Sequence, residues 1–287
     1  MNPKYPVFIP TKGRWESRLT IKAFENIGIP YKAVIEKQEY KQYAKVVDPK
    51  NILVLPHQNK GLVVTRNWIW DYAQSLGVKR FWTFDDNIGS TTSTQGIVEL
   101  FRLNRNLKIP VATGTPLKII EDFVDRYENV PIAGMHYFMF ASRKSVLPPF
   151  YLNTRIYSNM LIETNAKDPS GKLYRNEGFY NDDTDLCLRV LKDGFCTILF
   201  NAFLIFKNVT MTIDGGMTPH YQDDGRYKMA KELQEKHPDV TKITRKWGRW
   251  QHHVDYSRFR KNKLIRKKGI TIPEGINNYG LVLKILK

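Results

Sequence analysis

The chain has 287 residues, of which 42% are hydrophobic and 13% are aromatic, and this content excludes an intrinsically disordered protein. Its 45 Lys and Arg residues outnumber its 28 Asp and Glu residues, and the net charge of +17 favours an anionic partner or a solvated basic surface. The apolar runs are short and no apolar leader opens the sequence, so we expect no membrane-spanning segment and a cytoplasmic location. The two cysteines give neither a disulfide framework nor a zinc pattern.

Strand-like and helix-like segments alternate in the first third of the chain. Strands are predicted over residues 5–10, 33–36, 52–55 and 80–84, and helices over residues 19–27 and 61–76. The second helix is indicated by Val64, Trp68 and Tyr72 at four-residue spacing, with Gly77 after its last turn. This alternation predicts βαβ units and an α/β fold with a mostly parallel central sheet flanked by helices.

The rest of the chain is predicted to extend the same domain. Residues 89–96 are a polar stretch and a candidate mobile loop. Helices are predicted over residues 117–127, 182–192 and 225–237, and strands within residues 132–142, 149–163 and 195–206. Because the sequence has no internal repeat and no clear linker, we expect one α/β domain over residues 1–240. A basic C-terminal extension over residues 241–287 is expected to pack on it.

Oxygen-bearing side chains follow the apolar strand predicted over residues 80–84. Asp85, Asp86 and Asn87 stand at its carboxyl end, where open α/β sheets bind their ligands. Carboxylates together with phosphate oxygens are how proteins hold Mg²⁺ or Mn²⁺ on a diphosphate. Asp and Asn are also common in turns that end strands. Two adjacent acids favour metal or substrate binding over a simple turn.

Three acids open the helix predicted over residues 182–192. Asn181 or Asp182 is suited to cap this helix, and acids in its first turn complement the helix dipole. However, Asp182, Asp183 and Asp185 together exceed what capping needs. Asp183 is therefore also a candidate general base.

Basic and glycine-bearing segments supply candidate contacts to a diphosphate. They are residues 11–14 after the first strand, Arg66 on the second helix, and Gly215 with Gly216, which also read as a plain turn. The chain contains neither the P-loop pattern nor G-x-G-x-x-G, so NAD binding has no support.

A basic tract with embedded aromatic residues lies near the C-terminus. Between residues 242 and 268, 11 Lys or Arg residues stand against the single acid Asp255. Such a tract suits a phosphate backbone with stacked bases, although a membrane surface or a solvated surface would also attract it. Within the tract, His252 and His253 either lie on opposite faces of a strand or supply one metal ligand. The residues predicted to contact DNA are Arg245, Lys246, Trp247, Arg249, Trp250 and Tyr256.

Several short blocks in a fixed order resemble one family. The blocks cover residues 8–14, 66–70, 85–87, 153–158, 180–186 and 200–204. They are similar to the TET-associated glycosyltransferases of bacteriophages, which are members of the GT-A fold class. That family is associated with the addition of sugars to 5-hydroxymethylpyrimidines in phage DNA. The resemblance runs from Tyr5 to about His253 and implies a GT-A-like, Rossmann-like fold.

The resemblance also implies roles for individual residues. Nucleotide-sugar contacts fall on Pro10, Thr11, Arg14, Arg66, Asp85 and Asp86, and metal ligands fall on Asp86, Asn87 and His253 or its neighbour His252. Asp183 falls on the acidic motif whose carboxylate is the base in inverting members. The family pattern has Glu where this chain has Asp182, so either carboxylate remains a candidate base.

The resemblance implies a divalent cation, Mn²⁺ or Mg²⁺, and a UDP-sugar donor. The expected acceptor is double-stranded phage DNA that carries a 5-hydroxymethylpyrimidine, most simply 5-hydroxymethylcytosine, in the cytoplasm of an infected bacterium. We expect no membrane partner and no obligate protein partner.

Other functions remain open at this level. A glycosyltransferase with a protein, lipid or polysaccharide acceptor would use the same donor site. A metal-dependent nuclease or nucleotidyltransferase also combines acids with a basic surface, but no compact cluster at nuclease-like spacing is visible in the sequence. A non-catalytic DNA-binding module is the last alternative, and acids at the ends of elements argue against it because they repel phosphate.

Overall fold

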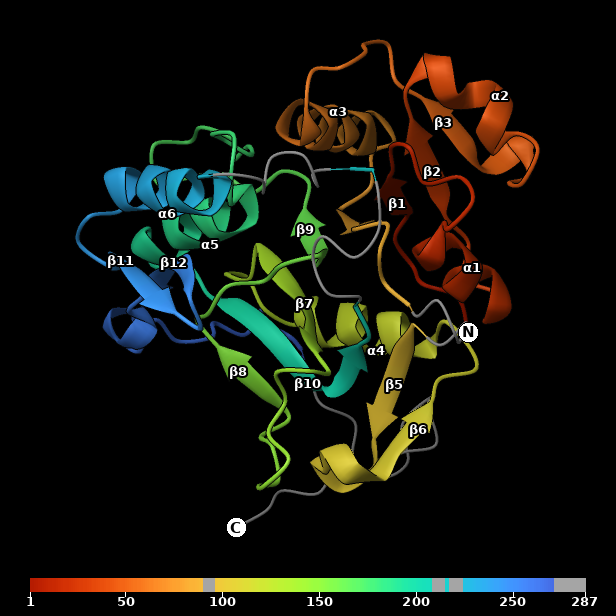
Figure 1. Ribbon diagram of the computed structural model, residues 1–287. Helices are drawn as coiled ribbons and strands as arrows, with labels where there is room; N and C mark the ends of the chain where they lie inside the picture. Colours follow the sequence, from red (N-terminus) through yellow and green to blue (C-terminus); the bar gives the residue numbers. More distant parts are fainter. Residues whose placement is uncertain (90–95, 208–214, 217–223, 271–287) are drawn as a thin grey trace.

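The computed structural model describes residues 1–89, 96–207, 215–216 and 224–270, and a large sheet runs through the centre of this part (Figure 1). Its strands are β1 (Val7–Pro10), β2 (Lys32–Ile35), β3 (Ile52–Val54), β4 (Arg80–Phe84), β5 (Ile97–Leu100), β6 (Lys108–Pro110), β7 (Ile132–Tyr137), β8 (Phe150–Leu152), β9 (Asn159–Glu163) and β10 (Thr197–Ile205). Their order across the sheet is β3-β2-β1-β4-β9-β7-β10-β5-β6, and β8 pairs with β10.

Most strands of this sheet point in the same direction. β3, β2, β1 and β4 pair in parallel. β9 is antiparallel to both β4 and β7, so β7 and its parallel neighbour β10 point the same way as β1 and β4. The predicted α/β fold with a mostly parallel sheet flanked by helices is therefore confirmed. The reversed strand β9 was not predicted, because hydrophobic periodicity does not identify the partner of a strand.

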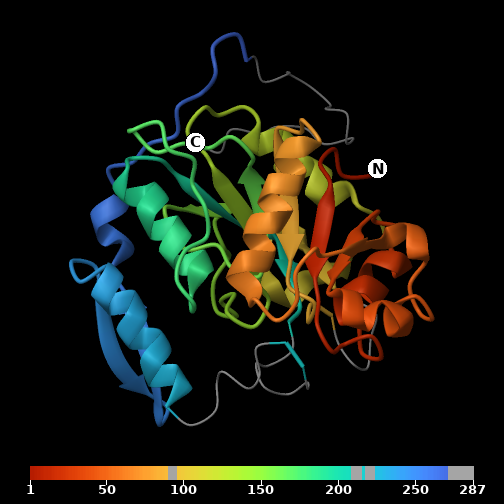
Figure 2. The same cartoon turned by 90° about the horizontal axis from the view of Figure 1, so that it is seen from above.

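Helices cover both faces of the sheet. They are α1 (Leu19–Asn26), α2 (Tyr40–Tyr43), α3 (Leu62–Ser75), α4 (Thr115–Val124), α5 (Asp182–Lys192) and α6 (Gly225–Lys236). α1 and α4 pack with Trp82 on one face, whereas α3 and α5 pack with Phe81 on the other. Because successive side chains of a strand alternate, β4 anchors both cores. Figure 2 shows α3 and α5 on the same side of the sheet.

The basic tract begins with a hairpin outside the large sheet. β11 (Thr241–Lys246) and β12 (Arg249–Val254) pair antiparallel, and Trp247 and Gly248 turn between them with positive φ angles of 50° and 72°. An apolar cluster of Leu188, Leu191, Leu233, Val240 and Phe259 joins α5, α6 and the chain on either side of the hairpin. In Figure 1 the hairpin lies beside α6. The predicted domain boundary at residue 240 stays a prediction.

Each predicted element has an observed counterpart to within a few residues, whereas α2, β5, β6, β11 and β12 were not predicted. The helix predicted over residues 117–127 begins two residues earlier, at Thr115. The segment over residues 195–206 forms the single strand β10, whose register shifts between Phe200 and Leu204. Most of the loop predicted over residues 89–96 lies outside the described residues. In the part of the chain that is described, no helix combines the length and the apolar content needed to cross a bilayer.

Candidate active site

Several strands deliver their ends to one edge of the sheet. β1, β4, β7 and β10 run in the same direction and end there, and the reversed strand β9 begins there. Consequently the residues after Pro10, Phe84, Tyr137 and Ile205 meet the residue before Asn159. This is the edge at which open α/β sheets bind ligands. The carboxylate cluster defined by Asp85, Asp86, Asp182 and Asp183 lies here.

Asp86 is buried against the loop that follows β1. Thr11 Oγ1 donates to Asp86 Oδ2 at 2.9 Å, and Arg14 donates to Asp86 Oδ1. Tyr43 shares a hydrogen bond with Thr11 Oγ1 at 2.7 Å, which fixes that loop behind Pro10, the buried last residue of β1. Burial raises the pKa of Asp86, and the Arg14 charge opposes this effect. Asp86 therefore fixes Thr11 and Arg14, to which the resemblance assigns nucleotide-sugar binding.

Gly215 packs directly on this loop. The Gly215 carbonyl accepts from Arg14 at 3.1 Å, and the Gly216 N–H donates to the Lys12 carbonyl at 3.1 Å. Gly215 has a φ of +88°, and a Cβ there would lie 2.9 Å from the carbonyl oxygens of both Lys12 and Gly13. Only glycine therefore fits without displacing the backbone. The pair Gly215-Gly216 is thus more than a plain turn, since it orients Arg14.

Asp85 is surrounded by donors on both of its carboxylate oxygens. Arg66 donates to Oδ1 at 2.9 Å, while Ser158 and Lys207 donate to Oδ2 at 2.6 and 2.8 Å. Burial disfavours the charged form, but the Lys207 and Arg66 charges outweigh it and hold the pKa of Asp85 well below its usual range. Asp85 is therefore ionised at neutral pH.

Arg66 also binds the first acid of α5. One of its guanidinium nitrogens lies 2.7 Å from both Oδ1 and Oδ2 of Asp182, and the other contacts Asp85. Arg66 and Asp182 are both buried. Because both oxygens of Asp182 are engaged by this guanidinium, Asp182 is the less accessible of the two candidate bases.

Asp183 has a different environment from its neighbour. It keeps partial exposure, and its Oδ1 accepts from the N–H and hydroxyl of Thr184 at 2.6 and 3.1 Å. Burial and the nearby Asp182 charge raise the pKa of Asp183, although Arg66 and Arg155 oppose the rise. A carboxylate with raised proton affinity beside the cluster is suited to general-base catalysis.

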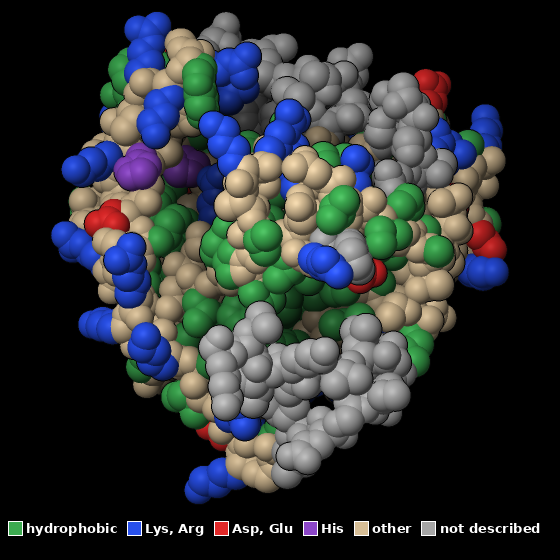
Figure 3. Space-filling model, turned by 90° about the horizontal axis from the view of Figure 1, so that it is seen from below, with side chains coloured by type: hydrophobic (Ala, Val, Ile, Leu, Met, Phe, Trp, Pro, Cys, Tyr) green, Lys and Arg blue, Asp and Glu red, His purple; other side chains and the backbone are tan. Residues whose placement is uncertain are grey.

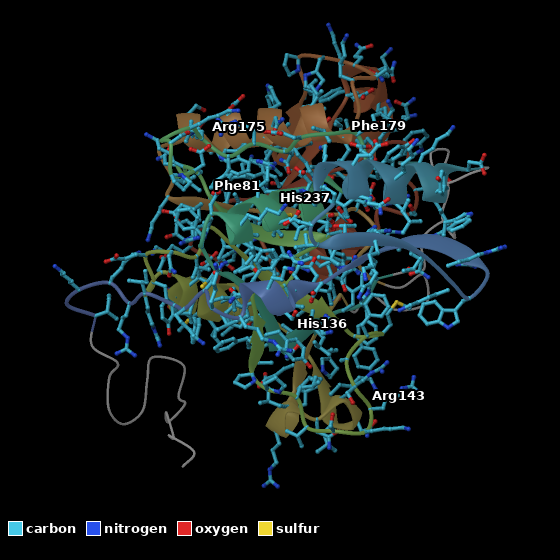
Figure 4. The ribbon with its side chains drawn as sticks, turned by 90° about the vertical axis from the view of Figure 1, so that its left-hand side faces the viewer. Phe81, His136, Arg143, Arg175, Phe179 and His237 are labelled. Atoms are coloured by element: carbon cyan, nitrogen blue, oxygen red, sulfur yellow. The ribbon has the colours of Figure 1, made fainter. Side chains whose placement is uncertain are left out.

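The remaining polar residues around the start of α5 are structural. Asn181 occupies the capping position with a left-handed φ of 49°, but its side chain donates to the Met229 carbonyl and does not cap the helix. The predicted Asn181 cap is therefore wrong, because contact with α6 competes for the amide. Asp185 contacts Arg189 at 2.9 Å and His237 at 3.0 Å, which ties α5 to the end of α6 (Figure 4).

Arg155 links the cluster to the C-terminal hairpin. Its guanidinium lies 4.4 Å from the Tyr157 ring centroid and 3.3 Å from His252 Nε2. Burial and the Arg155 charge lower the pKa of His252 to about 4, so this imidazole is neutral at physiological pH. Arg155 and His252 are 97 positions apart in the sequence, and the fold brings them into contact. The charge of Arg155 also interacts with that of Asp183.

The amino-acid sequence matches one family across this whole site. The model of the family described as TET-Associated Glycosyltransferase matches residues 5–216, which include every member of the carboxylate cluster. The chain belongs to the TET-associated glycosyltransferase family. It is accordingly a glycosyltransferase, which excludes a non-catalytic DNA-binding module as its sole function. No protein in the curated set matches the chain.

The metal site implied by the TET-associated glycosyltransferase resemblance does not assemble among the described residues. No group of three His, Cys, Asp or Glu side chains there is placed to hold an ion. His253 is exposed, whereas His252 turns toward Arg155. Both oxygens of Asp86 accept hydrogen bonds from protein donors, whereas Asn87 Oδ1 is buried without a partner. Protein sites for Mg²⁺ use one or two carboxylates together with substrate phosphates, and the carboxylate of this predicted ligand set is already engaged by Thr11 and Arg14.

Most of the residues predicted to contact DNA lie on the hairpin of β11 and β12, outside residues 5–216, which match the family model. Trp247 is 87% exposed at the turn and Trp250 is 42% exposed. Arg245 lies over the Trp250 ring at 5.7 Å, and Lys246 and Arg249 are exposed beside it. Tyr256 does not join this surface, since its hydroxyl is buried. The prediction that Tyr256 contacts DNA is therefore not supported.

A buried and an exposed aromatic ring stack next to the cluster. Tyr137, at the end of β7, donates to or accepts from Ser158, and its ring stacks on Phe140 with centroids 5.5 Å apart. Phe140 and Met139 are 55% and 48% exposed. Figure 3 shows apolar side chains in a hollow on the face seen from below, with Lys and Arg side chains mainly to the left of and above it.

Sequence reasoning missed three members of this active site. Lys207 was assigned no role because it follows a long strand without any motif. Ser158 and Arg155 lie in a block that resembles the family, yet no chemistry was assigned to them. The signal that finds them is topological, since residues after β10 and before β9 must reach the same edge as Asp85.

Proposed function

We propose that this glycosyltransferase moves a sugar from a nucleotide-sugar to the hydroxymethyl group of a 5-hydroxymethylpyrimidine in DNA. The observation that carries the proposal is the difference between two adjacent acids. Asp182 is bound to Arg66, whereas Asp183 is not. One carboxylate organises cations while its neighbour has raised proton affinity. This is the arrangement that an acceptor hydroxyl and a diphosphate donor require.

The donor end of the reaction uses the cations of the site. The diphosphate of a UDP-sugar gains negative charge as it leaves, and Arg14, Arg66 and Lys207 are the cations nearest the cluster. Fixed positive charge aimed at a developing anion lowers the barrier without reorganisation. Thr11 and Pro10 lie beside Arg14 and would contact the nucleotide.

The acceptor end of the reaction uses Asp183. The hydroxymethyl oxygen attacks the anomeric carbon from the face opposite the diphosphate, and a new C–O bond forms. The bond between the anomeric carbon and the β-phosphate oxygen breaks, and its electron pair leaves with the nucleoside diphosphate. The acceptor proton passes to Asp183. This single displacement inverts the anomeric configuration.

The DNA acceptor is supported by two surfaces of the chain. The exposed residues Arg245, Lys246, Trp247, Arg249 and Trp250 combine positive charge with rings on which bases stack. The exposed Phe140, which stacks on the buried Tyr137, offers a second ring surface, and Tyr137 shares a hydrogen bond with Ser158. Because a base within a duplex is inaccessible, the enzyme would take it out of the stack.

A transfer assay tests this function. Duplexes that differ only in carrying cytosine, 5-hydroxymethylcytosine or 5-hydroxymethyluracil are incubated with a panel of UDP-sugars, digested to nucleosides and weighed by mass spectrometry. A hexose or pentose increment on a hydroxymethylated nucleoside alone is expected, and Asp183→Asn should abolish it. Release of UDP without any increment on DNA would contradict the acceptor and point to a protein, lipid or glycan.

A further inference from the structure

Lys207 lies beside Asp85, the first residue of the Asp85-Asp86-Asn87 motif that the resemblance assigns to a metal. Its ammonium lies 2.8 Å from Asp85 Oδ2, contacts Ser158 Oγ, and lies 5.5 Å from the centroid of the Tyr137 ring. Only 15% of its side chain is exposed. A divalent cation binds carboxylate oxygens at about 2.1–2.6 Å. An ion bound to Asp85 Oδ2 would therefore lie close to this ammonium and be repelled by its positive charge.

The other oxygens of the Asp85-Asp86 pair are also occupied by protein donors. Arg66 donates to Asp85 Oδ1 at 2.9 Å, Arg14 donates to Asp86 Oδ1, and Thr11 donates to Asp86 Oδ2 at 2.9 Å. Each carboxylate oxygen of Asp85 and Asp86 therefore accepts a hydrogen bond from a protein donor. The two carboxylates of the motif that the resemblance assigns to a metal are thus engaged by donors of the chain itself, and Asn87 Oδ1 is the oxygen of that motif that has no donor.

The charges of these groups balance. Asp85, Asp86 and Asp182 carry three negative charges, and Arg14, Arg66 and Lys207 carry three positive charges within hydrogen-bonding distance of them. Without Lys207 this set would have a net charge of −1 and would repel a diphosphate. With Lys207 it is neutral before the donor binds, and Asp183 and Arg155 add one charge of each sign beside it.

We propose that Lys207, fixed by Asp85 and Ser158, supplies with Arg66 the positive charge that the donor diphosphate needs, so that transfer requires no divalent metal. The inference rests on the proposed function, because it concerns the charge that meets the leaving diphosphate. Burial against the Tyr137 ring keeps the ammonium in place, and a fixed cation in a partly dehydrated site acts more strongly than one in water.

The test combines a binding arm with an activity arm. In the binding arm, Mn²⁺ is titrated with the full-length protein and followed by the electron paramagnetic resonance of free Mn²⁺, and UDP binding is measured by calorimetry in EDTA. The wild type should leave the Mn²⁺ signal unchanged and should bind UDP in EDTA. Lys207→Met should weaken that binding roughly 10-fold, whereas Lys118→Met, on the surface of α4, should not change it.

In the activity arm, transfer to hydroxymethylated DNA is measured in EDTA and in Mn²⁺ or Mg²⁺. The wild type should be equally active in all three, and Lys207→Met should lose roughly 100-fold in kcat, with partial rescue by Lys207→Arg. Thermal unfolding of each variant separates this loss from misfolding. Loss of wild-type transfer in EDTA with recovery in Mn²⁺, or Mn²⁺ binding at the site, would overturn the inference.

Failure of the proposed function gives a different result. If no sugar reaches DNA under any condition, the acceptor assignment is wrong, but the binding arm still decides the role of Lys207. UDP binding in EDTA that depends on Lys207, with no Mn²⁺ bound, would uphold the metal-free donor site. UDP binding that requires Mn²⁺ would reject it.

Discussion

One guanidinium nitrogen of Arg66 lies 2.7 Å from both carboxylate oxygens of Asp182, although 116 residues separate the two in sequence. This contact joins α3 to the first turn of α5 on the same face of the sheet. It also assigns different roles to two adjacent acids, since the same guanidinium does not bind Asp183. The arrangement of the active site follows from this contact.

Asp183→Asn should remove the base and little else. The amide keeps the size of the side chain and the contact to Thr184, but it cannot accept the acceptor proton. We expect kcat to fall roughly 10²–10⁴-fold while the Kd for UDP stays within about 2-fold. Steady-state transfer kinetics and calorimetry check both values.

Asp182→Asn is the matched comparison at the neighbouring position. It would leave the buried Arg66 with a single carboxylate partner, so UDP binding and thermal stability should change together with turnover. Equal losses of kcat with unchanged UDP binding in both variants would contradict the division of roles between the two acids.

The pH dependence of turnover should report Asp183. A base acts only when deprotonated, so kcat should rise with pH through the raised pKa of Asp183 and then level off. Arg155 opposes that rise in pKa, and Arg155→Met should therefore move the acid limb to higher pH. A limb that stays in place, or moves to lower pH, would show that another group titrates.

The same carboxylate links stability to pH with a definite sign. An acid whose pKa is raised on folding stabilises the protonated native state, so its contribution is present at low pH and is lost as pH rises through the raised value. Asp183→Asn should therefore be more stable than the wild type above that pH and equal to it below. Thermal unfolding at several pH values measures the difference.

The hairpin should bind DNA through both charge and stacking. Trp247→Ala should weaken binding by about 1–3 kcal/mol, because its exposed ring would stack on a base. Arg249→Ala should reduce the slope of log K against log salt by about 1. Tyr40→Ala, an exposed ring on α2, is the control. Equal effects at Trp247 and Tyr40 in a fluorescence anisotropy titration would argue against a hairpin contact.

Asp125 should be important for stability although it lies away from the active site. It follows α4 and accepts from Lys4 at 2.6 Å and from the fully buried Arg80 at 3.1 Å. Burial acts to raise its pKa, but hydrogen bonds from Lys4, Tyr5 and Lys79 hold that pKa well below its usual range. Asp125→Asn should cost about 2 kcal/mol of unfolding free energy at neutral pH. Because the pKa is lowered on folding, this loss should shrink as pH falls through the ordinary Asp range.

Chemical denaturation at two pH values measures the effect. Asp122→Asn, one turn earlier on α4, is the control, because its pair with Lys118 has the (i, i+4) spacing of a helix-surface contact worth about 0.5 kcal/mol. A cost at Asp125 no larger than at Asp122 would contradict the structural role.

Local sequence patterns predicted most elements and part of the site. The run before Asp85 identified β4, because a buried strand is short, apolar and ends at polar residues. Asp183 was found as a candidate base because three acids exceed what a helix start needs. Lys207 was not found, since a single lysine after a strand has no pattern, and the role predicted for Tyr256 stays a prediction, because composition does not report that its hydroxyl is buried.

The sequence by itself determined the family, the alternation of strands and helices, and the acids that end β4 and begin α5. These depend on the periodicity of side chains and on short motifs, which are properties of neighbouring residues. Only the tertiary structure decided which cation meets which carboxylate. The reversal of β9 and the end of β10 bring Ser158 and Lys207 to Asp85, and contacts between residues so far apart depend on the topology of the sheet.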